Sequence, residues 1–532
     1  MGFTSFKFLV FLFAVVVAYY VVPRRFQWAL LLAASYGFYL SGGGVESLCY
    51  ILATTLFTYF SALWMQSLRD KNQKHILSLG EEITKDKARD MKKATAKKIH
   101  RIQVLTVLVN LGVLVLLKLI NMAKQDPSFL GISPDMPLMN LIVPLGLSYY
   151  TFNSIGYLID IGRGKYAAQR HIGKFALFTS FFPSIVQGPL CRFGDVGVQL
   201  GTPHAFSYKN LKHGAQLILW GFFKKIVIAD RLAVITATIF SPTFTDYNGS
   251  QIFFGVLAYS FQIYGDFSGG TDIARGAAQM LGINLPMNFE RPFFANSMGD
   301  FWRRWHMSLG AWMREYVFYP VMLSRPVTAV SKKFRLKWGP HAGKMVPSVA
   351  APFVVFFLIG IWHGVTAQYI TNGLYNAFLI SGGVALGPVF QKLIQKLKIN
   401  TESFSWRLFQ ILRTFTLLCI SRIIVKAPSL GEGFRMIGAM FTSVDLGFIT
   451  GADKVMFSYG LSETELSLIF VCVMVLFVVG ILQENGVKIR EGLDRQNFIF
   501  RWGMILLLFA AVLIFGVYGP GYNARDFIYG NF

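Results

Sequence analysis

Residues 354–378 read VVFFLIGIWHGVTAQYITNGLYNAF and include no lysine, arginine, aspartate or glutamate. A helix of about 20 apolar residues is long enough to cross a hydrocarbon core of about 30 Å. Apolar runs of similar length recur along the chain, at residues 6–22, 26–40, 47–65, 102–122, 139–160, 175–188, 215–240, 251–267, 347–364, 367–389, 408–424, 466–482 and 501–519. The sequence therefore predicts an all-α polytopic membrane protein with about 11–13 transmembrane helices.

The composition of the 532-residue chain supports a membrane location. Hydrophobic residues make up 54% of the chain and charged residues only 15%, whereas a soluble domain carries about 25% charged residues. Lysine and arginine total 51 against 27 acidic residues, a net charge of +24. The basic residues cluster in short loops between apolar runs, as cytoplasmic loops do. We therefore expect contact with membrane lipids and no nucleic-acid partner.

The cysteines do not suggest a metal site. Cys49, Cys191, Cys419 and Cys472 lie in apolar segments with no CxxC spacing. This pattern indicates neither a zinc site nor a disulfide framework. We expect small core residues and no bound metal.

The polar stretch 67–101 separates the early apolar runs from the later ones. It ends in EEITKDKARDMKKATAKKIHR, with acidic residues toward its start and lysines toward its end. We expect a solvated cytoplasmic helix pair at the membrane surface, and hence an external N-terminus. The predicted organisation is N-terminal transmembrane helices (1–66), a basic cytoplasmic insertion (67–101), a catalytic core (102–400), C-terminal transmembrane helices (401–519) and an external tail (520–532).

Residues 284–320 mix charges, prolines and bulky aromatic side chains too densely for a lipid-facing helix. Trp305, Leu309, Trp312 and Met313 recur at helical spacing and predict an amphipathic helix in the interface or lining a re-entrant cavity. Trp302 and His306 would share one flank of that helix.

His363 is the one histidine in the otherwise apolar run 354–378. An ionisable residue at membrane depth suggests a functional site, and a neutral imidazole can accept a proton from a hydroxyl near pH 7. Gly360 and Gly364 would let a long substrate pass close to the backbone. The alternative is a packed, hydrogen-bonded histidine with no chemical role.

Several longer segments carry a family resemblance when they are taken together and in order. They are PLGLSYYTFNSIGYLIDIGRG (144–164), FFPSIVQGPLCRF (181–193), GFFKKIVIADRLA (221–233), YSFQIYGDFSGGTDIARGAAQMLGINLPMNFERPF (259–293), DFWRRWHMSLGAWMREYVFYP (300–320) and GIWHGVTAQYITNGLY (360–375). The chain resembles the bacterial membrane-bound O-acyltransferases, especially the alginate O-acetylase type and the related teichoic-acid D-alanine transfer proteins.

The resemblance implies a rim of tilted membrane helices around a thin core, where a cytoplasmic and an external funnel meet. It implies that His363 is the catalytic base and that His306 supports the reaction. It also implies transfer of an acyl group from a cytoplasmic thioester to a hydroxyl group outside or within the membrane.

We expect the substrates to contact Trp302, Arg303, Arg304, Trp362 and Asn376. Arg303 and Arg304 would steer the phosphates of coenzyme A or the acidic groups of a carrier protein. Asn376 stands where many relatives have a histidine, so the resemblance leaves the class of acyl acceptor open.

The chain ends in RDFIYGNF (525–532), which resembles the F-x-Y-x-x-F ending of acyl-relay components in such export systems. Tyr529 would then carry the acyl group transiently, because a phenol with a pKa of about 10 leaves readily from its ester. The alternative is an aromatic anchor at the membrane interface.

The leading hypothesis is therefore an O-acyltransferase of the bacterial plasma membrane that uses acetyl-CoA, with no bound cofactor, to acetylate a cell-surface polysaccharide. A secreted or membrane-anchored SGNH-type acetyltransferase is the expected partner. The alternative is D-alanyl transfer to teichoic acid from an acyl carrier protein thioester. A transporter or channel is disfavoured because the sequence shows no internal repeat, and protein palmitoylation fits less well.

Overall fold

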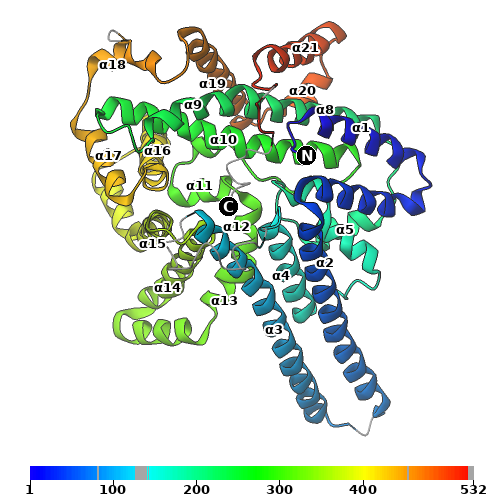
Figure 1. The fold of residues 1–532 in the computed structure, drawn as a ribbon. Coiled ribbons are helices and arrows are strands. Elements are labelled where there is room, and N and C mark those ends of the chain that lie inside the picture. The colour runs from blue at the N-terminus through cyan, green and yellow to red at the C-terminus, as the bar shows by residue number, and fades with distance from the viewer. Residues whose placement is uncertain (81–82, 126–140, 142, 452–453, 520, 525–532) are drawn as a thin grey trace. The chain divides into compact units, whose positions relative to one another are not determined.

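The computed structural model consists of α-helices joined by short 3₁₀ and π-helical turns (Figure 1). It describes residues 1–80, 83–125, 141, 143–451, 454–519 and 521–524. Over these residues the β-pairing is one isolated bridge, between Phe289 and Trp305. The all-α prediction is confirmed.

The described chain forms two compact units. Unit 1 contains Met1–Ile218, Thr271–Pro286 and, at the end of the described chain, residues 523–524, and unit 2 contains Leu219–Gly270 and Met287–Tyr522. Both histidines that the sequence singled out belong to unit 2.

Within the described residues, 7 helices are long and apolar enough to cross a membrane, which confirms a multi-pass membrane protein. They are α2 (Gln27–Ser78), α3 (Lys85–Gln125), α14 (Arg325–His363), α15 (Ala367–Lys396), α16 (Phe404–Lys426), α19 (Glu463–Glu484) and α21 (Phe498–Phe515). The number is smaller than the expected 11–13 because some of the predicted runs merge and others are broken into short helices.

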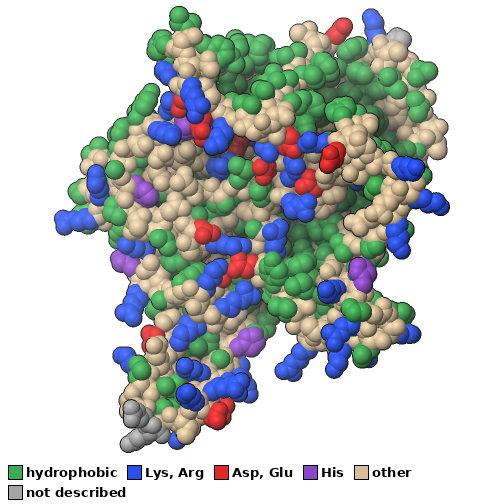
Figure 2. Space-filling view, turned by 180° about the vertical axis from the view of Figure 1, so that it is seen from behind, with side chains coloured by type: hydrophobic (Ala, Val, Ile, Leu, Met, Phe, Trp, Pro, Cys, Tyr) green, Lys and Arg blue, Asp and Glu red, His purple; other side chains and the backbone are tan. Residues whose placement is uncertain are grey.

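Helix α2 contains both predicted runs, 26–40 and 47–65, which the non-helical backbone of Gly44 separates with a φ of 72°. The polar insertion is helical, as predicted, but it is not a separate helix pair. Instead, α2 continues to Ser78 and α3 begins at Lys85, so the insertion extends two apolar helices that lie side by side (Figure 1). Lysine and arginine side chains cover this hairpin near its tip (Figure 2).

The predicted run 175–188 is not one helix. It divides into α5 (Ile172–Ser180) and α6 (Phe182–Ile185). Pro183 lies in the first turn of α6 and has no backbone N–H, so it cannot continue the hydrogen bonds of α5. The other helices of unit 1 are α1 (Phe6–Val21), α4 (Leu147–Arg163), α7 (Val198–Gly201) and most of α8 (Tyr208–Phe222). Three cysteines are buried as expected, but Cys49 is exposed.

In unit 2, the run predicted at 215–240 is a continuous helical path with a π-helical centre. It consists of the end of α8, the π-helical segment η6 (Phe223–Ala229) and α9 (Asp230–Ile239). The other helices that lie wholly or partly in unit 2 are α10 (Gly249–Met280), α11 (Met298–Arg304), α12 (Met307–Met313), α13 (Tyr319–Met322), α17 (Leu430–Thr442), α18 (Leu446–Thr450) and α20 (Ile489–Asp494).

The amphipathic helix predicted from Trp305 onward is wrong at its start. Helix α11 ends at Arg304 and α12 begins at Met307, because the chain reverses through His306 with a φ of 47°. Leu309, Trp312 and Met313 do lie together on α12, but they are buried in protein. The basic stretch 325–344 is helical and forms the first part of α14, which bends at Gly339.

Candidate active site

Two short segments of unit 2 pair around His306. The Glu290 N–H donates to the Arg304 carbonyl at 2.9 Å, and the Met307 N–H donates to the Asn288 carbonyl at 2.9 Å. These bonds flank the bridge between Phe289 and Trp305. The pairing fixes the backbone on both sides of His306, which explains how a non-glycine residue is held at positive φ.

The imidazole of His306 is held by Asn288. Its Nδ1 lies 3.1 Å from Asn288 Oδ1, and the same oxygen accepts the Ser308 N–H at 3.1 Å and the Ser308 hydroxyl at 2.8 Å. Because Oδ1 already accepts a backbone N–H, it is the acceptor for the histidine as well. Nδ1 therefore carries the proton, and the lone pair of the neutral ring lies on Nε2.

The surroundings of His306 keep the ring neutral. Its side chain is packed edge-on against Phe267, with ring centroids 4.7 Å apart, and the residue is only 4% exposed. Burial, with a smaller contribution from the nearby His363, lowers the pKa of His306 to about 3. The neutral imidazole is thus the form present at physiological pH.

His363 is the last residue of α14, so it lies at a helix end and not within a continuous span. Its ring is 4.6 Å from that of Trp362 and 6.1 Å from that of Tyr369, to which it is nearly parallel at 17°. The Trp362 ring lies 6.5 Å from the His306 ring. Trp362 therefore lies close to both predicted histidines.

The glycines beside His363 serve close packing of α14 on α15. A methyl group at Gly360 would lie 2.8 Å from the Tyr369 carbonyl oxygen and 2.9 Å from the Gly373 Cα. A methyl group at Gly364 would lie 2.5 Å from the Tyr369 ring. The space that the sequence suggested for a passing substrate is filled by α15 at both positions.

Trp302 and Asn376, two of the predicted substrate contacts, are bonded to each other. The Trp302 indole N–H donates to Asn376 Oδ1 at 3.1 Å, and Asn376 Nδ2 donates to the Asn372 carbonyl at 2.9 Å and to Ser421 Oγ at 3.3 Å. Asn376 is 1% exposed. Its amide therefore ties α11, α15 and α16 together.

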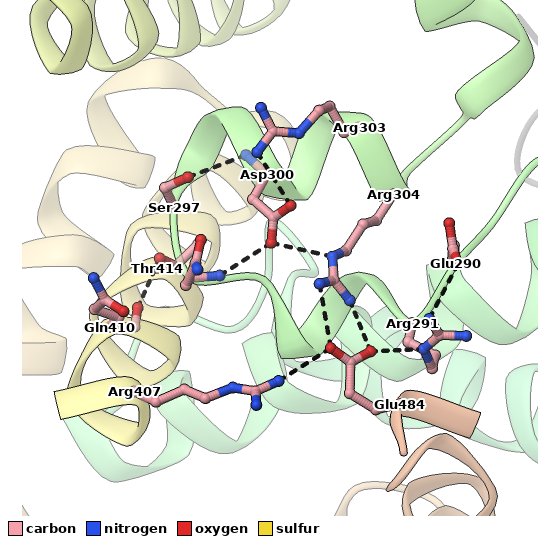
Figure 3. A network of polar contacts seen from close by, with 11 residues as sticks. Glu290, Arg291, Ser297, Asp300, Arg303, Arg304, Arg407, Gln410, Thr414 and Glu484 are labelled. Carbon is pink, nitrogen blue, oxygen red and sulfur yellow. Dashed lines mark hydrogen bonds and ion pairs between the residues drawn. The ribbon is translucent and has the colours of Figure 1, made fainter. Parts of the chain in front are cut away.

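Arg303 and Arg304 have different environments. The Arg304 guanidinium contacts Asp300 at 3.1 Å and Glu484 at 2.9 Å, and Glu484 also contacts Arg291 at 2.7 Å (Figure 3). Burial alone would lower the pKa of Arg304, but the two carboxylates outweigh it and raise that pKa. Arg303 reaches Asp300 at 3.3 Å, yet its side chain is 63% exposed. Arg303 alone of this pair is presented to a solute.

Four further residues belong to this site and were not predicted from the sequence: Asn288, Phe267, Tyr369 and Glu484. The first three lie in the motifs quoted above, but nothing in their spacing indicates a histidine partner. Glu484 is the last residue of the apolar helix α19. A single acidic residue at the end of such a helix was the one sequence feature that could have indicated its role. Tyr529 lies outside the described residues. Within the described part of the chain, no cluster of His, Cys, Asp and Glu has the makings of a metal site.

Comparison with known proteins identifies the family. Residues 167–335 match the membrane-bound O-acyltransferase family model. The chain is 30% identical over 436 residues to the probable alginate O-acetylase AlgI of Pseudomonas syringae pv. tomato, covering 80% of this chain and 72% of that relative. The chain belongs to the membrane-bound O-acyltransferase family. It is an O-acyltransferase.

Other members of the membrane-bound O-acyltransferase family show how broad the similarity is. The teichoic acid D-alanyltransferase of Bacillus subtilis is 33% identical over 291 residues, 54% of this chain and 69% of that relative. The peptidoglycan O-acetyltransferase of Helicobacter pylori is 27% identical over 331 residues, 57% of each chain. The family match at 167–335 includes His306, and the tertiary structure brings His363 to it.

Proposed function

We propose that this O-acyltransferase moves an acetyl group from cytoplasmic acetyl-CoA across the bacterial plasma membrane for O-acylation of a cell-surface polysaccharide. The observation that carries the proposal is the meeting of His306 and His363 at Trp362. In its neutral form, each of these imidazoles can accept a proton from a hydroxyl group and later return it. The Trp362 ring provides an apolar surface beside them. The similarity to a probable alginate O-acetylase supports acetyl as the acyl group and a polysaccharide as the final acceptor.

His363 is the general base of the proposed reaction. It accepts the proton of an attacking hydroxyl while the hydroxyl oxygen forms a bond to the thioester carbonyl carbon. The C–S bond then breaks, and the departing thiolate takes the proton back from the imidazolium. His306 assists as a neutral imidazole that Asn288 holds in place through Nδ1.

Tyr529 supplies the attacking hydroxyl. Its phenolic ester is activated relative to an alkyl ester, so the acyl group can pass onward to sugar, directly or through a secreted SGNH-type acetyltransferase. The transfer direction requires the insertion 67–101 in the cytoplasm and both termini outside, as the distribution of basic residues favours.

Arg303 and the Trp362 ring would orient the acyl donor. Arg303 is exposed enough to meet the phosphates of coenzyme A, and Trp362 lines the histidine pair. Trp302 and Asn376 would act by holding α11 against α15, because their polar groups are bonded to protein.

The second candidate is D-alanyl transfer to teichoic acid from a carrier-protein thioester. The specific support for it is the 33% identity to the teichoic acid D-alanyltransferase of Bacillus subtilis. The same histidine pair would serve, since both donors are thioesters.

Purified full-length enzyme in liposomes tests the proposal. Radiolabelled acetyl-CoA and D-alanyl carrier protein are offered separately, and thiol release and labelled protein are measured. We expect acetyl-CoA to be used, with a loss of roughly 10²–10⁴-fold in His363→Ala. His341→Ala is the matched control, because His341 is an exposed histidine on the same helix. Normal turnover by His363→Ala would refute the assignment of the base, and use of the carrier protein alone would select the second candidate.

A further inference from the structure

The chain that follows α21 is fastened to η6 and α9, all within unit 2. The Val517 N–H donates to the Ile226 carbonyl at 2.9 Å. Arg231 donates from Nε and a terminal nitrogen to the Phe515 carbonyl at 3.2 and 3.1 Å. Further along, the Tyr522 hydroxyl donates to Asp230 Oδ2 at 3.0 Å. The last of these bonds lies just before the tail that carries the F-x-Y-x-x-F ending.

Asp230 is itself part of a buried charge cluster. Lys225 Nζ lies 2.7 Å from Asp230 Oδ1 and 2.6 Å from Asp266 Oδ1, and both Lys225 and Asp266 are 2% exposed. A buried cation between two carboxylates holds each of them in a fixed place, because breaking such a pair leaves an uncompensated charge. The Tyr522 hydroxyl thus bonds to a carboxylate that cannot move away easily.

The cluster is one residue away from the histidine site along α10. Gly265 and Gly269 let α10 approach η6 and the end of α8 closely, since added methyl groups would lie 2.7 Å from the Lys224 carbonyl oxygen and 2.8 Å from that of Gly221. Asp266 lies between these glycines, and its neighbour Phe267 packs against the His306 ring at 4.7 Å. The segment η6 is π-helical, a distortion frequent at functional sites.

We infer that Tyr522, Asp230, Lys225 and Asp266 form an anchor that positions the C-terminal tail for acyl transfer. The inference rests on the proposed function, in which Tyr529 receives the acyl group. When the tail is held at Tyr522, about seven residues separate that point from Tyr529, and they can span at most about 25 Å. The Thr4 hydroxyl also donates to the Ala524 carbonyl at 3.3 Å. Loss of the Tyr522 bond therefore frees residues 518–523 between this contact and Val517, and the effective concentration of Tyr529 at His363 falls. Lost orientation adds to this reduction.

Tyr522→Phe and Asp230→Asn test the anchor in the full-length enzyme. We expect acylation of Tyr529, followed by intact mass, to slow by roughly 3- to 10-fold with KM for acetyl-CoA unchanged. A merely structural defect would instead lower the amount of folded protein or raise KM. Tyr518→Phe is the matched control, because the Tyr518 hydroxyl bonds within its own segment, to the Leu513 carbonyl.

A spin label tests the anchor independently of the relay. Asn523→Cys in a Cys49→Ser background receives the label, since Cys49 is the exposed cysteine. We expect an immobilised spectrum that becomes mobile in Tyr522→Phe and stays immobilised in Tyr518→Phe. An unchanged label spectrum and an unchanged transfer rate in Tyr522→Phe would overturn the anchor. Full activity of Tyr529→Phe together with a mobilised label would instead overturn the relay and leave the anchor standing.

Discussion

The ring of Tyr369 lies nearly parallel to the imidazole of His363, with ring centroids 6.1 Å apart, and fills the space beside Gly364. The position of the proposed base thus depends on a residue of the next helix. A side chain at Gly364 must displace the Tyr369 ring, which a methyl group would approach to 2.5 Å.

We therefore expect Gly364→Ala to lower acyl transfer by at least about 10-fold, because a shift of about 1 Å in a catalytic group can cost 10²-fold. Initial rates in liposomes measure the effect. Gly382→Ala on α15 is the control, since a methyl group there meets no atom within 4 Å. Equal rates for the two variants would show that Tyr369 does not position His363.

The buried, neutral His306 makes stability depend on pH. The pKa of this imidazole is lowered to about 3 in the folded protein, against about 6.5 in an unfolded chain. Between these values the unfolded state binds more protons, so stability falls as the pH drops from about 6.5 toward 3.

We expect thermal unfolding in detergent to show this loss in the wild-type enzyme and a shallower loss in His306→Gln, which does not titrate. His341→Gln provides the control with an exposed histidine. Parallel pH profiles for wild type and His306→Gln would contradict a neutral, buried His306.

Glu484 holds both segments that pair around His306. It contacts Arg291 at 2.7 Å and Arg304 at 2.9 Å, and its side chain is 14% exposed (Figure 3). Glu484→Gln removes the carboxylate that Arg291 and Arg304 share, and leaves each of these partly buried guanidinium groups with one remaining acid, Glu290 or Asp300. We expect a lower unfolding temperature and reduced activity, whereas Glu463→Gln at the exposed start of the same helix changes neither. A stable, active Glu484→Gln enzyme would remove this residue from the site.

Arg303 and Arg304 are adjacent in sequence but should respond differently to substitution. Arg303→Gln should raise KM for acetyl-CoA several-fold, and the effect should shrink at high salt because the side chain is exposed. Arg304→Gln should mainly lower the unfolding temperature, since Arg304 is bonded to Asp300 and Glu484. Unaltered donor kinetics in Arg303→Gln would leave that arginine as a surface charge only.

Tyr529→Phe should abolish acylation of the polysaccharide while expression and membrane insertion stay normal, because a single oxygen is removed. Intact-mass analysis of the wild-type C-terminal peptide during turnover should show an added acetyl group. Full polysaccharide acylation by the Phe variant would leave Tyr529 as an interfacial anchor.

Local pattern was sufficient to predict the membrane class, the polar middle at 284–320 and the candidacy of His306 and His363. Hydropathy summed over about 20 residues reports whether a helix can lie in lipid, and an ionisable group in an apolar run is visible without any partner. The same pattern could not show where helices merge or break. Gly44 interrupts α2 with a φ of 72°. The turn at His306 separates α11 from α12, because backbone bonds to the distant segment 288–290 hold it.

Only the tertiary structure decided what each polar group of the site binds. Asn288 sets the tautomer of His306, Trp362 joins the two histidines, and Glu484 separates the role of Arg304 from that of Arg303. The residue type shows that a buried polar group needs a hydrogen-bond partner. Which residue becomes that partner depends on the segment that packs within about 3 Å of the group. That choice depends on the long-range packing of helices, which no local window of the sequence contains.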